Sequence, residues 1–268
     1  MTAHLEVVPV QRLREEFGLA GASAILLTGS RVAGGDYPGS DVDFLAIFDD
    51  PAAVPAAIGH PGAVSMANSM GENWLGRVGG EEVNVAAVSA VTVRRLAGLL
   101  AAPIGPLRTP ALQQFEIVLL QRLRVGVPVL GEEYLAGLVD QRVLARLPVA
   151  TFVLYFTSAA GHVQTARRLL DAGDPFAFEM LMMAAVGAIG LSTLCLCDRS
   201  AASFKKVATE LAALEQRHPG LPVRRADLVA IGSGSSPPLR LALAEAALAR
   251  LRGAVPDGAP WAEARDAL

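Results

Sequence analysis

The sequence predicts an α+β protein in which a small mixed β-sheet domain, residues 1–105, precedes an all-α helical bundle, residues 106–268. Short apolar runs bounded by glycine and proline fill the first third of the chain, as expected for strands. After Pro103, Pro106 and Pro110 the apolar spacing becomes helical. The second half is rich in alanine and leucine and poor in aromatic residues, which favours a closely packed bundle. A length of 268 residues suffices for two such domains.

The sheet domain is expected to begin with an amphipathic helix over 10–19 and to carry a short helix over 51–59, which proline favours at its first turn. Short apolar or alternating runs predict five strands, at 25–27, 41–48, 63–69, 74–78 and 82–88. The last two strands form a hairpin through the Gly79-Gly80 turn. The helical bundle is predicted to follow Pro103, Pro106 and Pro110, because the apolar residues beyond them recur with helical spacing. Its expected helices are 109–125, 132–146, 151–172, 175–197, 201–217 and 238–252.

Three segments of the second domain are predicted to be irregular. Residues 126–131 form a connector, and residues 232–237, GSGSSP, form a flexible loop. The tail from Gly253 onward is expected to fray, with Trp261 available as an anchor.

A turn after the first strand has the composition of a phosphate-binding site. The apolar run 25–27 leads to Gly29, where a tight turn needs no side chain, and to Ser30, a good N-cap for a following helix. A strand, a turn and a helix start together present free backbone N–H groups that attract phosphate oxygens. The Ser30 hydroxyl adds a hydrogen bond, and Arg31 adds positive charge.

Two aspartates follow a glycine-rich loop and open the next strand. Because residues i and i+2 share one face of a strand, Asp41 and Asp43 project together while Val42 and Phe44 face the core. Neighbouring carboxylates repel each other unless a cation lies between them, and Mg²⁺ prefers carboxylates together with substrate phosphates. The spacing therefore predicts a magnesium site beside the phosphate turn.

This ordered set resembles the signature of the polymerase-beta-type nucleotidyltransferases, in which a Gly-Ser turn precedes an Asp-x-Asp strand. Gly29-Ser30 followed by Ser40, Asp41 and Asp43 matches that pattern over about a tenth of the chain. The layout of catalytic sheet and helical bundle is similar to aminoglycoside nucleotidyltransferases of the streptomycin and kanamycin types. The resemblance implies that the turn binds the nucleoside triphosphate and that the two acids hold Mg²⁺.

The same resemblance implies a third acid on a neighbouring strand, and two registers place it differently. Residues 82–85, Glu-Val-Asn-Val, are similar to the Glu-Val-Thr-Val run of streptomycin-type enzymes, which makes Glu82 the metal ligand or general base. In the other register, 83–85 replaces a Val-Asp-Leu run and the acid has become the amide of Asn84. We expect Glu82, because only a carboxylate accepts a proton from an acceptor hydroxyl.

Two lysines in the second domain are candidate phosphate ligands. Lys205 and Lys206 are the only lysines in the chain and lie near a helix start. The resemblance implies a basic residue from the helical domain on the triphosphate, and an ammonium suits that role. A solvated helix start is the competing interpretation. Acidic side chains exceed basic ones in residues 1–102, and the balance reverses in residues 103–255.

Composition restricts the cellular compartment and the partners expected for the protein. Cys195 and Cys197 lie in an apolar run without neighbouring histidines, which indicates buried thiols in a reducing cytoplasm and argues against zinc. No secretory signal is recognised at the N-terminus. Residues 180–197 carry no charge, but their amphipathic neighbours favour a central bundle helix over a membrane span. No basic stripe with aromatic residues indicates nucleic acid. The apolar surplus permits a homodimer.

The sequence thus predicts a cytoplasmic, magnesium-dependent nucleotidyltransferase. It would transfer a nucleoside monophosphate, most readily AMP from ATP, to a hydroxyl of a small molecule and release pyrophosphate. One alternative is a protein-AMPylating enzyme of the same superfamily. Another is a catalytically decayed nucleotide-binding protein, which the amide of Asn84 would indicate.

Overall fold

The protein is described here from a computed structural model. The described residues are 8–29, 32, 41–54, 64–68, 71–105, 112–199, 204–234 and 236–268. They form two compact units. The first contains Met1–Ala101 and Val118–Ala145, and the second contains Ala102–Ile117 and Arg146–Leu268.

The first unit is built on a six-stranded mixed sheet with the strand order β3-β4-β5-β2-β1-β6. Its strands are β1 (Ala24–Thr28), β2 (Val42–Phe48), β3 (Val64–Asn68), β4 (Gly71–Val78), β5 (Glu81–Ser89) and β6 (Val127–Leu130). Only β2 and β5 run parallel to each other, and the other neighbouring strands are antiparallel. The predicted α+β class and all five predicted strands are confirmed, and β6 is an addition.

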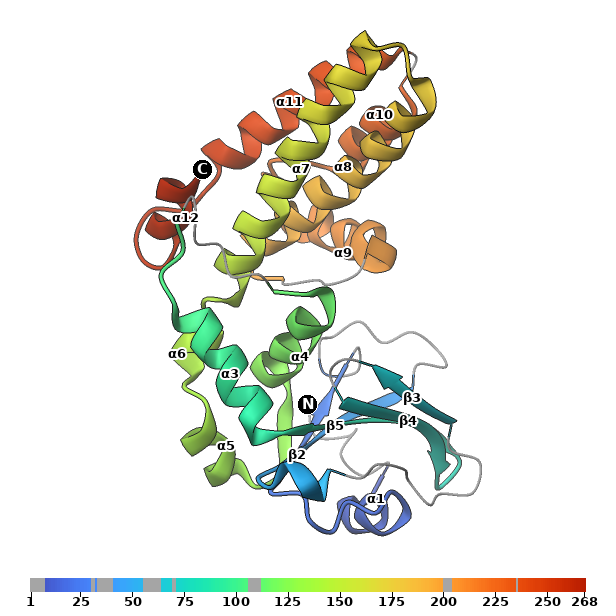
Figure 1. The fold of residues 1–268 in the computed structure, drawn as a ribbon, viewed down its shortest axis with the longest axis vertical. Helices are drawn as coiled ribbons and strands as arrows, with labels where there is room; N and C mark the ends of the chain where they lie inside the picture. The colour runs from blue at the N-terminus through green and yellow to red at the C-terminus, as the bar shows by residue number, and fades with distance from the viewer. Residues whose placement is uncertain are drawn as a thin grey trace. The chain divides into compact units, whose positions relative to one another are not determined.

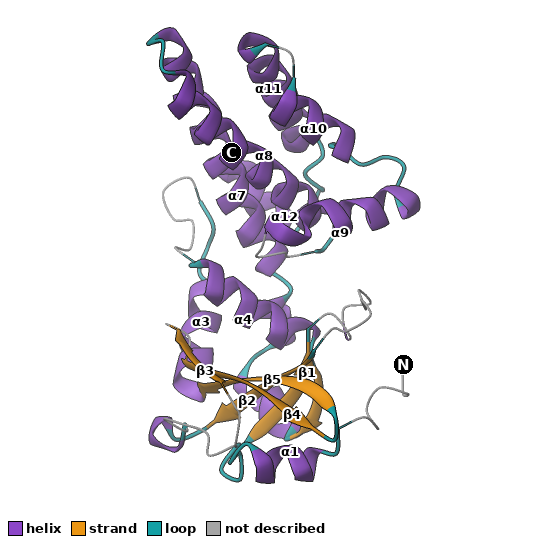
Figure 2. Cartoon of the chain, turned by 90° about the vertical axis from the view of Figure 1, so that its right-hand side faces the viewer, coloured by secondary structure: helices purple, strands orange, loops and turns teal. Residues whose placement is uncertain are grey.

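Helices cover both sides of this sheet, with α1 and α3 on opposite sides (Figure 1, Figure 2). The helical elements of the unit are α1 (Val10–Glu16), the 3-10 helix η1 (Pro51–Ala53), α3 (Ala90–Ala101), the latter part of α4 (Gln114–Val125), α5 (Glu132–Leu138) and α6 (Gln141–Leu144). The core on the α1 side contains Leu13 and Phe17 together with Val42, Phe44 and Val83. By strand alternation, the residues between these apolar positions face the opposite side of the sheet.

The segment predicted as a connector, residues 126–131, is instead the edge strand β6, paired with β1. Pro128 is tolerated there because an edge strand has unpaired backbone positions. Two glycines let this strand lie against β1. A β-carbon on Gly126 would lie 2.9 Å from Leu26 Cδ2, and one on Gly131, where φ is +70°, would lie 2.1 Å from the Ser23 carbonyl oxygen. This pairing places residues 118–145 in the first unit, whereas the sequence boundary near residue 105 assigned them to the bundle.

The second unit is helical. Its helices, besides the start of α4, are α7 (Leu147–Asp171), α8 (Pro175–Leu196), α9 (Phe204–Arg217), α10 (Arg225–Ser233), α11 (Pro237–Gly253) and α12 (Trp261–Ala267). Helices α7 and α8 lie side by side, and α11 packs along α7 (Figure 1). The tail predicted to fray forms α12, whose Trp261 ring meets the Phe152 ring edge-on at 5.5 Å between centroids. Helices α3 and α10 were not predicted.

The two most apolar helical segments are partly buried. Residues Gln141–Asp171 and helix α8 are both long and apolar enough to cross a membrane, and 56% of the most apolar window of each is buried. Cys195 is buried and Cys197 is half-buried, and the two cysteines are not joined in a disulfide. On the exposed side of α8 lie Phe176 and Met180. The prediction that residues 180–197 form a core helix of the bundle agrees with the burial of α8. The prediction that no membrane is involved stays a prediction.

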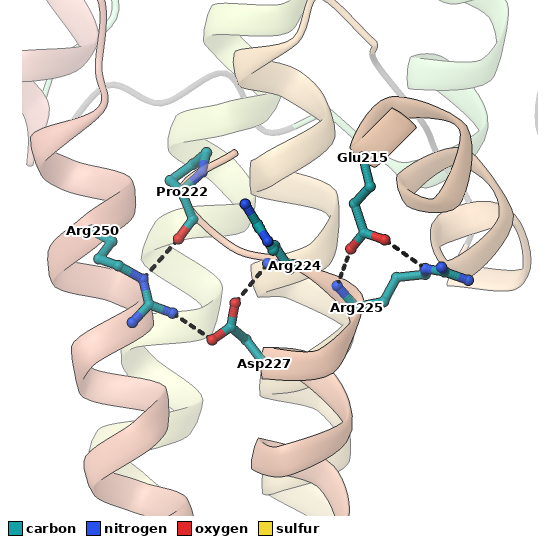
Figure 3. A network of polar contacts seen from close by, with 6 residues as sticks. All are labelled: Glu215, Pro222, Arg224, Arg225, Asp227 and Arg250. Carbon is teal, nitrogen blue, oxygen red and sulfur yellow. Dashed lines mark hydrogen bonds and ion pairs between the residues drawn. The ribbon is translucent and has the colours of Figure 1, made fainter. Parts of the chain in front are cut away.

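A polar network joins three helices at the start of α10 (Figure 3). The backbone N–H of Arg225 donates to Glu215 Oε1 at 2.6 Å, and Arg225 Nε donates to Oε2 at 2.9 Å. Arg250 of α11 donates to Asp227 at 3.0 Å and to the Pro222 carbonyl at 2.7 Å. The network therefore ties the loop before α10 to both α9 and α11.

Glu215 gives this network a dependence on pH. The backbone N–H of Arg225, followed by its guanidinium, lowers the pKa of Glu215. A lowered pKa stabilises the fold above the unfolded-state value and loses that contribution as pH falls through the folded-state value. We expect Glu215→Gln to lower the free energy of unfolding by about 0.5–1 kcal/mol at pH 7. Urea unfolding of both proteins should show the difference shrinking below about pH 4. If the two proteins differed in free energy of unfolding by the same amount at pH 7 and below about pH 4, the stabilising role of the Glu215 carboxylate would be contradicted.

Candidate functional site

The candidate site lies at the end of the sheet where β1 ends and β2 begins. Thr28, the last residue of β1, is paired with Asp43 on β2. Gly29 follows with φ at +79°, a conformation that glycine adopts without steric cost. A β-carbon on Gly29 would lie 2.0 Å from Asp43 Oδ2 and 2.8 Å from Asp43 Cβ. The predicted phosphate turn and the predicted metal ligand are therefore in direct contact, and only glycine permits that approach.

Two donors from distant parts of the chain hold the other oxygen of Asp43. Asn84 of β5 is the register partner of Asp43, and its Nδ2 donates to Asp43 Oδ1 at 2.9 Å. Arg122 Nη2, from α4, donates to the same oxygen at 2.9 Å and forms an ion pair with it. The Arg122 and Asp43 side chains are only 16% and 13% exposed. This ion pair is therefore shielded from solvent far more than an ordinary surface pair.

The connection between α4 and β6 explains how Arg122 reaches the site. Helix α4 ends at Val125, and the Gly126 N–H donates to the Arg122 carbonyl at 2.9 Å. A β-carbon on Gly126 would lie 2.5 Å from that carbonyl and 3.1 Å from Thr28 Cγ2. Glycine therefore allows the chain to pass from helix to strand directly beside β1, which places the last turn of α4 next to Asp43.

Buried polar atoms remain at this cluster. Asn84 Oδ1 and Arg122 Nη1 are buried and have no hydrogen-bond partner among the described residues. The amide nitrogen of Asn84 must face Asp43, since a carboxylate only accepts hydrogen bonds, and this leaves its oxygen available. Leaving a buried polar group unpaired costs about 1–3 kcal/mol. The cluster therefore offers one donor and one acceptor to a ligand.

Asn84, and not Glu82, contacts Asp43, so the expectation for the third acid is corrected. Glu82 is 53% exposed and forms an ion pair with Arg77 on the adjacent strand β4 at 2.9 Å. The reason is the parallel register, which pairs Val42 with Val83 and hence Asp43 with Asn84. Asn84, the residue that the second sequence alternative put at this position, is therefore the neighbour of Asp43 on β5.

The other predicted site residues are placed only in part. Asp41 immediately precedes β2 and is half-buried. Ser30, Arg31 and Ser40 lie outside the described residues. Lys205 and Lys206 lie in α9, in the second unit, and their side chains are not among those described. Their roles stay predictions.

The acids present fit one magnesium ion and not a two-cation site. Asp41 and Asp43 provide two carboxylates, the number that Mg²⁺ commonly takes from a protein when substrate phosphates and water supply the rest. In the described part of the chain, no group of three or more histidine, cysteine, aspartate or glutamate side chains is placed to bind a metal ion. The residue paired with Asp43 on β5 is Asn84, which carries an amide and adds no third carboxylate.

Arg122 is the site residue that sequence reasoning missed. It is 79 positions from Asp43, in a helix that the boundary at residue 105 assigned to the other domain. The available signal was the pair Gly126 and Gly131 around an apolar run with proline, a pattern that also describes an edge strand returning to the sheet.

Comparisons with known proteins add little to this geometry. No protein-family model matches the chain. No curated protein matches it either. A solved structure to which it is similar is a nucleotidyltransferase-like protein from Exiguobacterium sibiricum 255-15, with a TM-score of 0.44 and 16% sequence identity, covering 90% of this chain and 73% of that one. Similarity at this level defines neither the fold nor the function of this chain.

Proposed function

We propose that the protein is a nucleotidyltransferase that binds a nucleoside triphosphate, most readily ATP, at the edge formed by Gly29 and Asp43. It would transfer the nucleoside monophosphate to a hydroxyl of a small-molecule acceptor. The supporting observation is the approach of the Gly29 turn to the Asp43 carboxylate, with 2.0 Å between Asp43 Oδ2 and the place of a β-carbon. It brings a phosphate-binding turn and a cation-binding carboxylate to one point.

The residues have separate tasks in this reaction. Asp41 and Asp43 would hold a magnesium ion, which neutralises charge on the triphosphate when bound. The turn at Gly29 would hold the phosphates through backbone N–H groups. The acceptor oxygen forms a bond to the α-phosphorus as the bond from that phosphorus to the pyrophosphate oxygen breaks. Pyrophosphate leaves with the electron pair of that bond, and the hydroxyl proton passes to solvent or to a base. Asn84 is not that base, because an amide does not accept the proton.

Pyrophosphate release tests this proposal. The purified protein would be supplied with ATP, Mg²⁺ and a panel of hydroxyl compounds, and pyrophosphate would be measured. We expect Asp41→Asn and Asp43→Asn each to lower the rate at least about 100-fold, because both remove charge where cation and phosphate meet. Circular dichroism would confirm that the variants are folded, and Asp41→Asn carries the test if Asp43→Asn is unstable. Equal rates in the wild-type protein and Asp41→Asn would refute the proposal.

A second candidate function is a nucleotide-binding protein without transferase activity. The observation that favours it is the replacement of the third acid by Asn84, together with the occupation of Asp43 Oδ1 by Arg122. ATP binding without pyrophosphate release across all acceptors would favour this candidate. A protein hydroxyl as acceptor is tested by mass spectrometry of a cell lysate incubated with the protein and labelled ATP.

A further inference from the structure

We propose that Arg122 is the resident cation of this site, which keeps free divalent cations away from Asp43 until nucleotide phosphates offer its guanidinium another anion. The inference rests on the proposed function for the identity of the anion. It concerns the order in which the site accepts its ligands.

The first support is the occupation of Asp43. Arg122 Nη2 and Asn84 Nδ2 both donate to Oδ1 at 2.9 Å, so the two donors use the two lone pairs of that oxygen. A metal ion that binds through Oδ1 must displace at least one of them. The pair is largely buried, which makes the competition strong, since solvent screens the charges little.

The second support is the charge around Asp43. One guanidinium already balances this carboxylate, and a divalent cation placed against the same oxygen would lie close to a positive charge. Beyond Asp41 and Asp43, the described residues place no third carboxylate at this point to offset that repulsion. Free divalent cations should therefore bind weakly.

The third support is the unused donor on Arg122. Nη1 is buried without a partner among the described residues, while Nη2 holds Asp43. A guanidinium binds phosphate through two parallel N–H groups more favourably than a carboxylate that it contacts through one. An arriving polyphosphate can thus draw Arg122 away from Asp43 and supply the anionic charge that a metal ion needs. By linkage, nucleotide and metal must then strengthen each other's binding by the same factor.

Binding of Mn²⁺ alone, followed by electron paramagnetic resonance, tests the inference on the full chain without nucleotide. We expect Arg122→Gln to bind Mn²⁺ at least about tenfold more tightly than the wild-type protein, because it removes the competing charge. Arg122→Lys keeps the charge and should bind Mn²⁺ as weakly as the wild type. The matched control is Arg94→Gln, which removes an arginine paired with Asp49 at 3.5 Å, beyond the other end of β2.

A second arm adds a non-hydrolysable ATP analogue. It should raise the Mn²⁺ affinity of the wild-type protein, and Arg122→Gln should bind the analogue about tenfold more weakly in the presence of EDTA. Unchanged or weaker Mn²⁺ binding by Arg122→Gln would overturn the inference, and so would tight Mn²⁺ binding by Arg122→Lys. If none of the proteins binds the analogue, the proposed function fails, while the Mn²⁺ comparison still decides whether Arg122 excludes the metal.

Discussion

Gly29→Ala is expected to abolish nucleotide binding and to lower the free energy of unfolding by about 3 kcal/mol. Alanine in the left-handed conformation, here with φ at +79°, costs about 1–2 kcal/mol. The added methyl group would also lie 2.0 Å from Asp43 Oδ2 and 2.8 Å from Asp43 Cβ, and separating turn and strand costs about a further 1–3 kcal/mol. The separation would move the turn that we propose to hold phosphate away from the Asp43 carboxylate. Urea unfolding and binding of a fluorescent ATP analogue measure the two effects.

Gly80→Ala is the matched control for this experiment. Gly80 lies in the turn between β4 and β5 with φ at +93°, and a β-carbon there meets no atom within 4 Å. The control should therefore lose only the conformational contribution, about 1–2 kcal/mol, and keep nucleotide binding. Equal destabilisation by the two substitutions, with binding intact in both, would show that the contact between Gly29 and Asp43 is unimportant.

Asn84→Asp is expected to turn a site that binds free Mn²⁺ weakly into one that is stabilised by it. The substitution replaces the amide donor, 2.9 Å from Asp43 Oδ1, with a second carboxylate. Among the described residues, two carboxylates beside the Arg122 guanidinium leave a net negative charge, which a divalent cation can neutralise. At a Mn²⁺ concentration about 100 times the dissociation constant, binding adds about 2.7 kcal/mol of stability. The thermal midpoint of the variant should then rise by about 5 °C or more.

The control for the added charge is Asn84→Ala, which removes the same hydrogen bond without introducing a carboxylate. Neither it nor the wild-type protein should respond to Mn²⁺ by more than about 1 °C. The idea fails if Mn²⁺ leaves the midpoint of Asn84→Asp unchanged or raises all three equally. Pyrophosphate release by the variant alone would in addition identify the natural chain as a nucleotide-binding protein that has lost its third acid.

Local signals account for the parts of the fold that were predicted well. The strands β1, β2, β4 and β5 follow from short apolar or alternating runs between turn residues, and the long helices from their apolar period. Helix α12 was missed because its stability comes from a distant contact, the Trp261 ring against Phe152 of α7. Strand β6 was missed because a run of four residues that contains proline becomes a strand only when a neighbouring edge accepts it.

The sequence by itself determined the strand, glycine turn and aspartate strand, because these features depend on neighbours along the chain. For the residue expected beside Asp41 and Asp43 on the neighbouring strand, the sequence left two candidates, Glu82 and Asn84. Only the tertiary structure decided between them, since the register of two parallel strands is set by packing across the sheet and pairs Asp43 with Asn84. The position of Arg122 beside Asp43 likewise depends on the tertiary structure, because the chain returns through Gly126 to the edge of the sheet. Asn84 is separated from Asp43 by 41 positions in the sequence, and Arg122 by 79 positions. Contacts over such separations leave no local periodic signal, although they determine which groups surround the Asp43 carboxylate.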